Sequence, residues 1–294
     1  MSWNARVSWT TFSRLDEMRI ALVQLNSGDM PLENLPVTEG YIRDAAKQGA
    51  EFILTPEVSN IVSTSRRHQN DVLHFEQDDP TLARLSEVAV ELGIWLLIGS
   101  LALKTGESDG RFANRSFLIG PDGKTQAKYD KIHMFDVDIT ETETWRESDG
   151  YRPGDQAVVA KTPVGNIGMT ICYDLRFPHL HRDLAKAGAE IITEPAAFSP
   201  VSGRAHWEVL LRARAIETGC FVLAPAQCGT HAISTGKPRS THGHSLAIAP
   251  WGEVLADAGT EPGITLVDID LAEVTSARKR IPSITHDRAY KAVQ

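Results

Sequence analysis

One cysteine in the chain has the sequence context of a nucleophile. Cys172 stands in the segment 168–178 (GMTICYDLRFP), where an apolar strand pattern leads into the cysteine and a helical pattern begins near Arg176. The partial positive charge and free N–H groups of a helix N-terminus favour a thiolate over a thiol. The segment therefore predicts a nucleophilic thiol, although a small buried hydrophobe explains Cys172 equally well when the segment is taken alone.

Two further segments could supply the base and the oxyanion donor that a cysteine needs when it attacks an unreactive amide. Glu57 closes the apolar run 52–57 (FILTPE), where a carboxylate faces either solvent or a site at the strand ends. Lys131 ends a predicted strand in the segment 128–138, where a solvated edge lysine is the alternative interpretation. None of the ten histidines has a context that marks it as the base of a papain-type site.

Glu57, Lys131 and Cys172, in this order, make the chain resemble the nitrilase superfamily of carbon–nitrogen hydrolases. The shared motifs are a Pro-Glu after a strand, a lysine before an apolar turn and a cysteine in an elbow, and the resemblance extends from residue 18 to about residue 280. It implies a four-layer α-β-β-α sandwich, often paired through its helices into a homodimer or a higher homo-oligomer. It also implies hydrolysis of a small-molecule amide without a metal or an organic cofactor.

The resemblance implies a role for each residue. Cys172 would attack the amide carbon to form a thioester, and Glu57 would take the thiol proton, pass it to the leaving group and then activate water. Lys131 and the backbone N–H of Tyr173 would stabilise the oxyanion. A carboxylate with an ordinary pKa of about 4.3 is a weak base for a thiol near 8.5. We therefore expect burial to raise the pKa of Glu57 and the helix N-terminus to lower that of Cys172.

A second glutamate is expected beside the lysine. Glu147, in the segment 145–154 (WRESDGYRPG), resembles the family's second glutamate and would orient Lys131 and balance its charge. The alternative is that Glu147 is solvated like Glu141 and Glu143 in the same polar loop.

Later segments indicate which amides the chain hydrolyses. The branch of the superfamily that acts on deaminated glutathione is the one most similar to the segments 196–203, 205–217 and 226–229. The sister omega-amidase branch acts on 2-oxo-dicarboxylic monoamides, and a nitrile or an N-carbamoyl compound is a further alternative. Because both amide substrates contain a 2-oxo acid, we expect a cation near the thiol. Arg176 is the candidate, since guanidinium binds carboxylate in a bidentate manner, but it could instead pair with Asp174 or Asp183.

The apolar pattern predicts the scaffold that must position these side chains. A chain of 294 residues with 42% hydrophobic content can bury a large core. Helices are expected up to about residue 48 and over 80–92, 176–188 and 204–218. Up to residue 100 they alternate with apolar runs, which predicts parallel strands, whereas the middle of the chain favours antiparallel hairpins. We expect an α/β fold of two packed mixed sheets, forming one domain over 18–294 after a flexible extension over 1–17.

Composition excludes several classes of protein. The net charge is −8 and no basic block is present, so no nucleic-acid partner is expected. The longest apolar stretch, 94–103, is about half the length of a membrane-spanning helix, and 1–17 has no apolar signal region, so no membrane partner is expected. Three cysteines without a C-x-x-C motif predict neither a disulfide framework nor a thiolate zinc site, which favours the reducing cytoplasm.

Two rival functions remain open on the sequence. A metal-dependent amidohydrolase needs an ordered ligand set, and the pairs His179/His181 and His242/His244 have no third ligand at a recognisable spacing. Such an enzyme would lose activity to a chelator and not to a thiol reagent. An inactive relative acting as a binding module would keep the fold, but it would have little reason to keep the glutamate, lysine and cysteine together.

Overall fold

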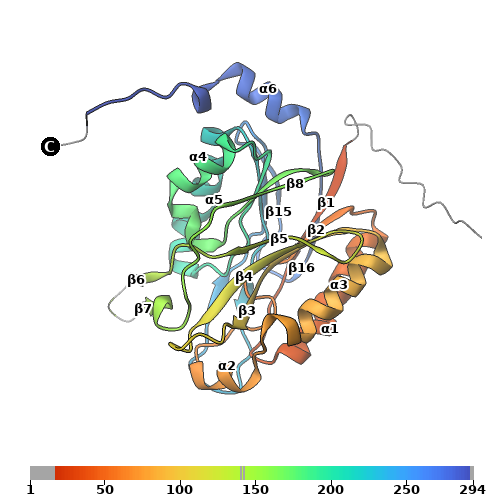
Figure 1. Cartoon of the computed structure of the whole chain (residues 1–294), viewed down its shortest axis with the longest axis vertical. Coiled ribbons are helices and arrows are strands. Elements are labelled where there is room, and N and C mark those ends of the chain that lie inside the picture. The colour runs from red at the N-terminus through yellow and green to blue at the C-terminus, as the bar shows by residue number, and fades with distance from the viewer. Residues whose placement is uncertain (1–16, 140, 142, 292–294) are drawn as a thin grey trace, which may run out of the picture.

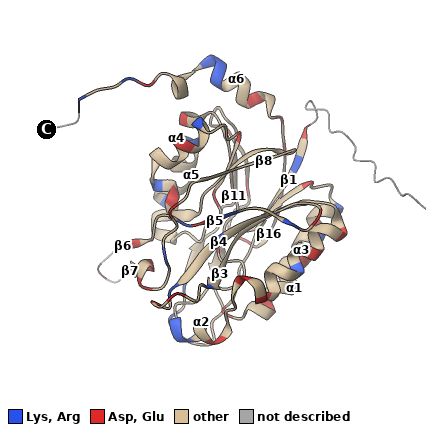
Figure 2. Ribbon diagram, viewed as in Figure 1, with Lys and Arg blue, Asp and Glu red and all other residues tan. Residues whose placement is uncertain are grey.

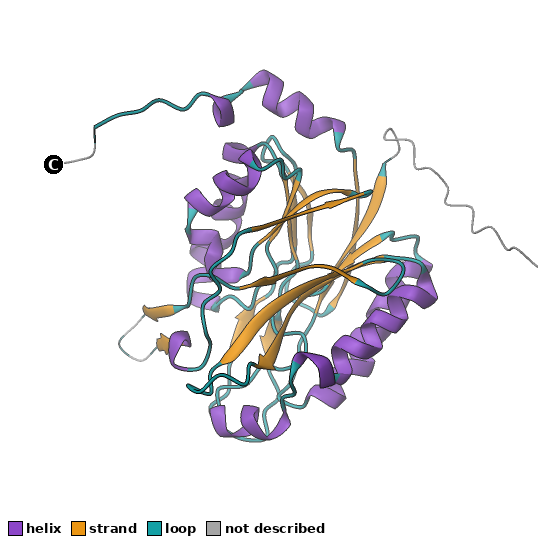
Figure 3. Cartoon of the chain, in the orientation of Figure 1, coloured by secondary structure: helices purple, strands orange, loops and turns teal. Residues whose placement is uncertain are grey.

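Two six-stranded sheets face each other between outer helices, as the α-β-β-α prediction requires (Figure 1). The computed structural model describes residues 17–139, 141 and 143–291, so the expected extension over 1–17 lies almost wholly outside the described residues. Figure 3 shows the strands in the middle of the molecule, with α1 and α3 on one side and α4 and α5 on the other. The helices are α1 (Pro31–Lys47), α2 (Arg66–Val72), α3 (Pro80–Leu92), α4 (Pro178–Lys186), α5 (Pro200–Thr218) and α6 (Ala272–Arg280).

The first sheet has parallel strands at its centre and antiparallel strands at its edges. Its order is β16 (Gly263–Ile269), β1 (Met18–Gln24), β2 (Phe52–Leu54), β3 (Trp95–Lys104), β4 (Phe112–Ile119) and β5 (Thr125–Asp130). Strands β1, β2 and β3 are parallel, which confirms the arrangement predicted from the alternation of strands and helices. Strands β3, β4 and β5 are joined as antiparallel hairpins, as the middle of the chain predicted.

The second sheet repeats this plan. Its order is β15 (Val254–Asp257), β14 (Leu246–Ile248), β11 (Phe221–Ala224), β10 (Ile191–Thr193), β9 (Gly165–Met169) and β8 (Val158–Thr162). The central strands β9, β10 and β11 are parallel, and the outer strands pair antiparallel. Two small ribbons lie outside the sheets: β6 (Asp136–Asp138) with β7 (Thr144–Arg146), and β12 (Cys228–Thr230) with β13 (Ser240–His242).

Strand β1 illustrates why these apolar runs form buried strands. Successive side chains of a strand point to opposite faces. Ile20 and Leu22 belong to the core between the sheets, whereas Ala21 and Val23 belong to the core under α1 and α3. A strand covered on both faces needs a continuous apolar sequence rather than an alternating one.

The helix boundaries match the sequence in part. Helix α3 occupies 80–92 as predicted, because the Asp79 side chain caps the Leu82 N–H and Gly93 ends the helix in the left-handed region. Both acidic and basic residues occur on α1 and α3 (Figure 2), and Arg84 of α3 forms an ion pair with Glu39 of α1. Helices α2 and α6 were not predicted, and no helix starts at Arg176: a 3₁₀ turn (Cys172–Arg176) precedes α4. Among the described residues, no helix combines the length and the apolar character that crossing a membrane requires.

Candidate active site

A strained loop after β2 presents Glu57. Thr55 Oγ1 accepts a hydrogen bond from the Gly99 N–H, and Ser100 Oγ accepts one from the Val58 N–H at 2.7 Å, so the loop is fixed to β3. A Cβ atom at Gly99 would lie 1.9 Å from the Thr55 carbonyl oxygen, so only glycine permits this approach. Val58 has φ +47°, an unusual value for a β-branched residue, and such strain concentrates at functional sites.

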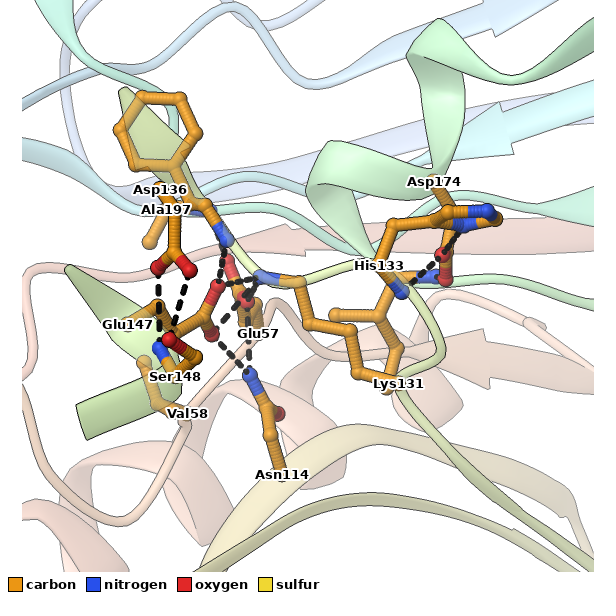
Figure 4. Close-up of polar contacts among 12 residues, drawn as sticks. Glu57, Val58, Asn114, Lys131, His133, Asp136, Glu147, Ser148, Asp174 and Ala197 are labelled. Atoms are coloured by element: carbon orange, nitrogen blue, oxygen red, sulfur yellow. Dashed lines mark hydrogen bonds and ion pairs between the residues drawn. The ribbon is translucent and has the colours of Figure 1, made fainter. Parts of the chain in front are cut away.

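Lys131 joins two glutamates in the interior (Figure 4). It follows β5, and only 2% of it is exposed. Its Nζ lies 2.9 Å from Glu57 Oε1, and 2.9 and 2.8 Å from the two carboxylate oxygens of Glu147. Buried charges are tolerated when they are paired and hydrogen-bonded in this way. The predicted placement of Glu147 beside Lys131 therefore matches the geometry, and Glu147 is not a freely solvated loop residue.

Two further groups hold Glu57 that the sequence analysis missed. Asn114 Nδ2 donates to Glu57 Oε1 at 2.8 Å, and the Ala197 N–H donates to Glu57 Oε2 at 2.8 Å. The Asn114 carbonyl oxygen also accepts the Lys131 N–H at 3.0 Å. A polar side chain inside the apolar strand 112–119 was the signal that could have identified Asn114, because buried amides need polar partners.

Cys172 begins the 3₁₀ turn that follows β9. Its φ is +52°, and its N–H donates to the Pro195 carbonyl oxygen at 3.0 Å. Asp174 fixes the turn by accepting the Ile171 N–H at 2.9 Å and the Tyr129 hydroxyl at 2.7 Å. Figure 4 shows the Asp174 carboxylate beside His133, away from the Lys131 ammonium. The elbow predicted from the sequence is thus present, but as a turn and not as the first turn of an α-helix.

The N–H of Tyr173, the next residue in the turn, has no hydrogen-bond acceptor among the described residues. Tyr173 and Cys172 both line the same cavity, which has a volume of about 280 Å³. This size suits a small-molecule ligand. An unused N–H beside the thiol is the arrangement that stabilises an oxyanion.

The pKa shifts in the site differ from those expected from the sequence. Burial alone would raise the pKa of Glu57, but the Lys131 ammonium outweighs burial and leaves that pKa below its ordinary value. Burial and the Glu57 carboxylate raise the pKa of Cys172 well above its ordinary value, and Lys131 offsets only part of this. Burial would lower the pKa of Lys131, yet the two glutamates raise it well above the usual range. The net pKa shifts of Glu57 and Cys172 therefore run opposite to the expected ones, and they favour a carboxylate at Glu57 and a protonated thiol at Cys172.

Five of the six predicted site residues line the cavity: Glu57, Lys131, Glu147, Cys172 and Tyr173. Arg176 does not line it. Its guanidinium lies 5.3 Å from the centre of the Phe198 ring, with one nitrogen 3.3 Å from His206 Nδ1. Within the described part of the chain Arg176 makes no ion pair, so the alternative partners Asp174 and Asp183 are not used. A carboxylate-binding role for Arg176 stays a prediction.

Three arginines line the cavity instead: Arg146, which lies in the segment 145–154, and Arg66 and Arg239, which the sequence analysis did not single out. Arg66 and Arg239 belong to no motif or periodic pattern, so only the fold brings them to the site. The remaining thiols, Cys220 and Cys228, are buried and do not line the cavity. In the described residues no group of three potential ligands is arranged to hold a metal ion.

The comparisons with known proteins agree with this geometry. The family model of the carbon–nitrogen hydrolases matches residues 19–279. The deaminated glutathione amidase of Yersinia enterocolitica is 41% identical over 272 residues, with 92% of each chain covered. The omega-amidase NIT2 of Bos taurus is 36% identical and covers 92% of this chain and 95% of its own.

A solved structure has the same fold. The NitFhit protein of C. elegans superposes with a TM-score of 0.86 at 34% identity over 93% of this chain. The match spans 66% of the NitFhit chain, so that protein has a further part without a counterpart here. The chain therefore belongs to the carbon–nitrogen hydrolase family, in the nitrilase-superfamily branch of the deaminated glutathione amidases and omega-amidases, and it is a hydrolase of carbon–nitrogen bonds other than peptide bonds.

Proposed function

We propose that the chain hydrolyses deaminated glutathione or a closely related amide, with Cys172 as nucleophile and Glu57 as general base. The observation that carries the proposal is the cluster of Glu57, Lys131 and Cys172 around one cavity, with Lys131 Nζ 2.9 Å from Glu57. The match to a deaminated glutathione amidase over 92% of the chain supports this substrate. The match to an omega-amidase favours a 2-oxo-dicarboxylic monoamide as the second candidate.

Acylation begins with the neutral thiol. As Cys172 Sγ forms a bond to the amide carbon, its proton moves to the Glu57 carboxylate, so no free thiolate has to exist beforehand. The carbonyl oxygen becomes an oxyanion that the Lys131 ammonium and the Tyr173 N–H stabilise. Removing one such donor typically costs about 2.7–4 kcal/mol in the barrier. When the tetrahedral intermediate collapses, the carbon–nitrogen bond breaks and Glu57 passes its proton to the leaving nitrogen.

In deacylation, Glu57 again accepts a proton and then donates it, with water in place of the thiol as the nucleophile. Glu57, again a carboxylate, takes a proton from a water molecule that attacks the thioester carbon. The second tetrahedral intermediate then releases the carboxylic acid, and the proton on Glu57 returns to Cys172 Sγ. Glu147 keeps Lys131 protonated and in place throughout, because both of its carboxylate oxygens bind Nζ.

Replacing each cysteine in turn tests the nucleophile. Cys172→Ala is expected to abolish amide turnover, whereas Cys220→Ala and Cys228→Ala retain most of it, since neither thiol lines the cavity. Activity is measured as amine or ammonia release from deaminated glutathione, 2-oxo monoamides, glutamine-like amides, N-carbamoyl acids and nitriles. Full activity in a folded Cys172→Ala protein would end the proposal, as would activity that EDTA removes and iodoacetamide does not.

We also propose that the enzyme is a cytoplasmic homodimer, with residues 18–294 as one domain. Exposed apolar side chains on α5 support the pairing, since Val201, Val209 and Ile216 are 42%, 67% and 57% exposed. Its three cysteines are all free thiols, which suits a reducing compartment. Light scattering of the purified protein tests the assembly: a twofold mass supports the dimer and a single-chain mass contradicts it.

A further inference from the structure

Two guanidinium groups that line the cavity form no ion pair with a carboxylate in the described part of the chain. Lys131 is paired with two glutamates, and Arg146 is paired with Asp138 at 2.8 Å. In contrast, Arg66 and Arg239 make no ion pair with any described residue, although both line the cavity. A cation left without a partner at a ligand cavity is available for an anionic ligand.

Arg239 is held close to the reacting groups. One of its nitrogens donates to the Ala197 carbonyl oxygen at 2.7 Å, and the N–H of that same residue donates to Glu57. Its guanidinium carbon lies 4.9 Å from the centre of the Trp145 ring. Stacking on an aromatic face leaves the edge of a guanidinium free, and among the described residues one of the five N–H donors of Arg239 is used. The charge of Arg239 also contributes to the lowered pKa of Glu57, which is consistent with this proximity.

Arg66 is anchored by different loops. It lies at the start of α2 and donates to the carbonyl oxygens of Gly110, at 3.0 Å, and of Asp149. Its guanidinium carbon is 5.9 Å from the centre of the Phe112 ring. The carbonyl groups fix its position without neutralising its charge. The two arginines therefore contribute separate positive charges to one cavity, each held by a different part of the chain.

We propose that Arg239 and Arg66 are two carboxylate subsites, Arg239 for the acyl group that becomes the thioester and Arg66 for the leaving amine. The assignment rests on the proposed function. A 2-oxo-glutaryl group places its carboxylate nearer the scissile carbon than a leaving cysteinyl-glycine does, and Arg239 is the arginine linked through Ala197 to Glu57. A substrate that releases ammonia offers nothing to Arg66, so this subsite favours the dipeptide amide over a simple monoamide.

The first test uses the wild-type enzyme and three substrates. These are 2-oxoglutaryl-Cys-Gly, the same compound with the glycine carboxylate converted to a carboxamide, and the same compound with the 2-oxo acid carboxylate converted to a carboxamide. Each neutralised carboxylate is expected to lower kcat/KM by about 10- to 100-fold, because hydrogen bonds to charged groups contribute about 1.5–3 kcal/mol. Equal kcat/KM for all three compounds overturns the inference. If the enzyme hydrolyses none of them, the proposed function itself fails.

The second test matches each arginine to one carboxylate. Arg66→Gln is expected to remove the preference for the glycine carboxylate, so that the ratio of kcat/KM for the parent compound to kcat/KM for the glycinamide compound falls to about one. Arg239→Gln is expected to remove the preference for the 2-oxo acid carboxylate only. Arg67→Gln is the matched control, because it removes a neighbouring exposed charge that does not line the cavity. A variant in which kcat/KM falls by one common factor for all three compounds has a structural defect only. This result in both variants contradicts the two carboxylate subsites.

Discussion

Glu57 and Glu194 both lie just after a central strand of their sheet, but their pKa values are shifted in opposite directions. Each follows a short central strand, β2 or β10, each adjoins a proline, and they are 4% and 0% exposed. Glu57 is bound by an ammonium, an amide and a backbone N–H. Glu194 Oε2 contacts His181 Nε2 at 3.0 Å and the Thr170 hydroxyl at 2.6 Å, whereas Oε1 has no hydrogen-bond partner within the described residues.

The pKa directions follow from these partners. Burial raises the pKa of Glu194, and its hydrogen bonds offset only part of the effect. The pKa of Glu57 falls despite equal burial, because Lys131 stabilises the carboxylate. Burial alone therefore does not set the direction in which the pKa of a buried glutamate shifts; for Glu57 the adjacent ammonium reverses the effect of burial. Glu57 lines the cavity together with Cys172, whereas Glu194 does not, so of these two glutamates Glu57 is the one placed to accept a proton from the thiol.

Of the substitutions considered, Lys131→Met should have the largest effect on the contrast between Glu57 and Glu194. It leaves the buried Glu57 and the partly buried Glu147 without their cation, so the pKa of Glu57 should rise as that of Glu194 does. Turnover should fall at least about 10³-fold, and the free energy of unfolding at pH 7 should fall by about 3–5 kcal/mol. The loss of stability should shrink near pH 4, because protonation removes the unpaired charge. Denaturant unfolding at several pH values measures the loss in free energy of unfolding, and Lys161→Met at an exposed lysine is the control. Equal losses of stability in the two variants would contradict the prediction.

Glu57→Gln tests how the Glu57 carboxylate acts on the Cys172 thiol. Turnover should fall about 10²–10⁴-fold because the base is lost. The pKa of Cys172 should nevertheless decrease, since the carboxylate that raises it is gone, whereas Lys131→Met should increase it. The pH midpoint of iodoacetamide alkylation at Cys172, followed by mass spectrometry, should thus move in opposite directions in the two variants. Midpoints that move together would show that Glu57 and Lys131 do not act on the thiol with opposite sign.

Glu194→Gln should have the smallest effect on turnover, less than about tenfold, which corresponds to 1.4 kcal/mol. In the wild type, the raised pKa of Glu194 means that stability falls as pH rises from the unfolded value of about 4.3 up to the folded pKa. The glutamine variant has no group that titrates there. The free energy of unfolding of the variant minus that of the wild type should therefore be larger at pH 7 than at pH 4. A loss of turnover as large as that of Glu57→Gln would contradict the contrast between the two glutamates.

The scaffold and the motif residues could be predicted because they leave local signals. Strand β1 is a continuous apolar run since both of its faces are covered, and α3 is marked by Asp79 and Gly93. The elbow at Cys172 could be placed because an apolar strand leads into it. Helix α2 begins inside a polar segment without an apolar stripe, and its N-cap at Ser65 was not recognised.

The amino-acid sequence predicted the fold class and the order of Glu57, Lys131 and Cys172 along the chain, and the resemblance that it carries implied Glu147 as the partner of Lys131. Only the three-dimensional structure shows that Asn114 supports Glu57, that Arg66 and Arg239 line the cavity while Arg176 does not, and that burial and Glu57 raise the pKa of the Cys172 thiol. The physical reason is that a Coulomb interaction depends on the distance between two charges and on their exposure to water. Residues 57 and 131 are 74 positions apart, and only folding places their charged atoms 2.9 Å from each other in the interior.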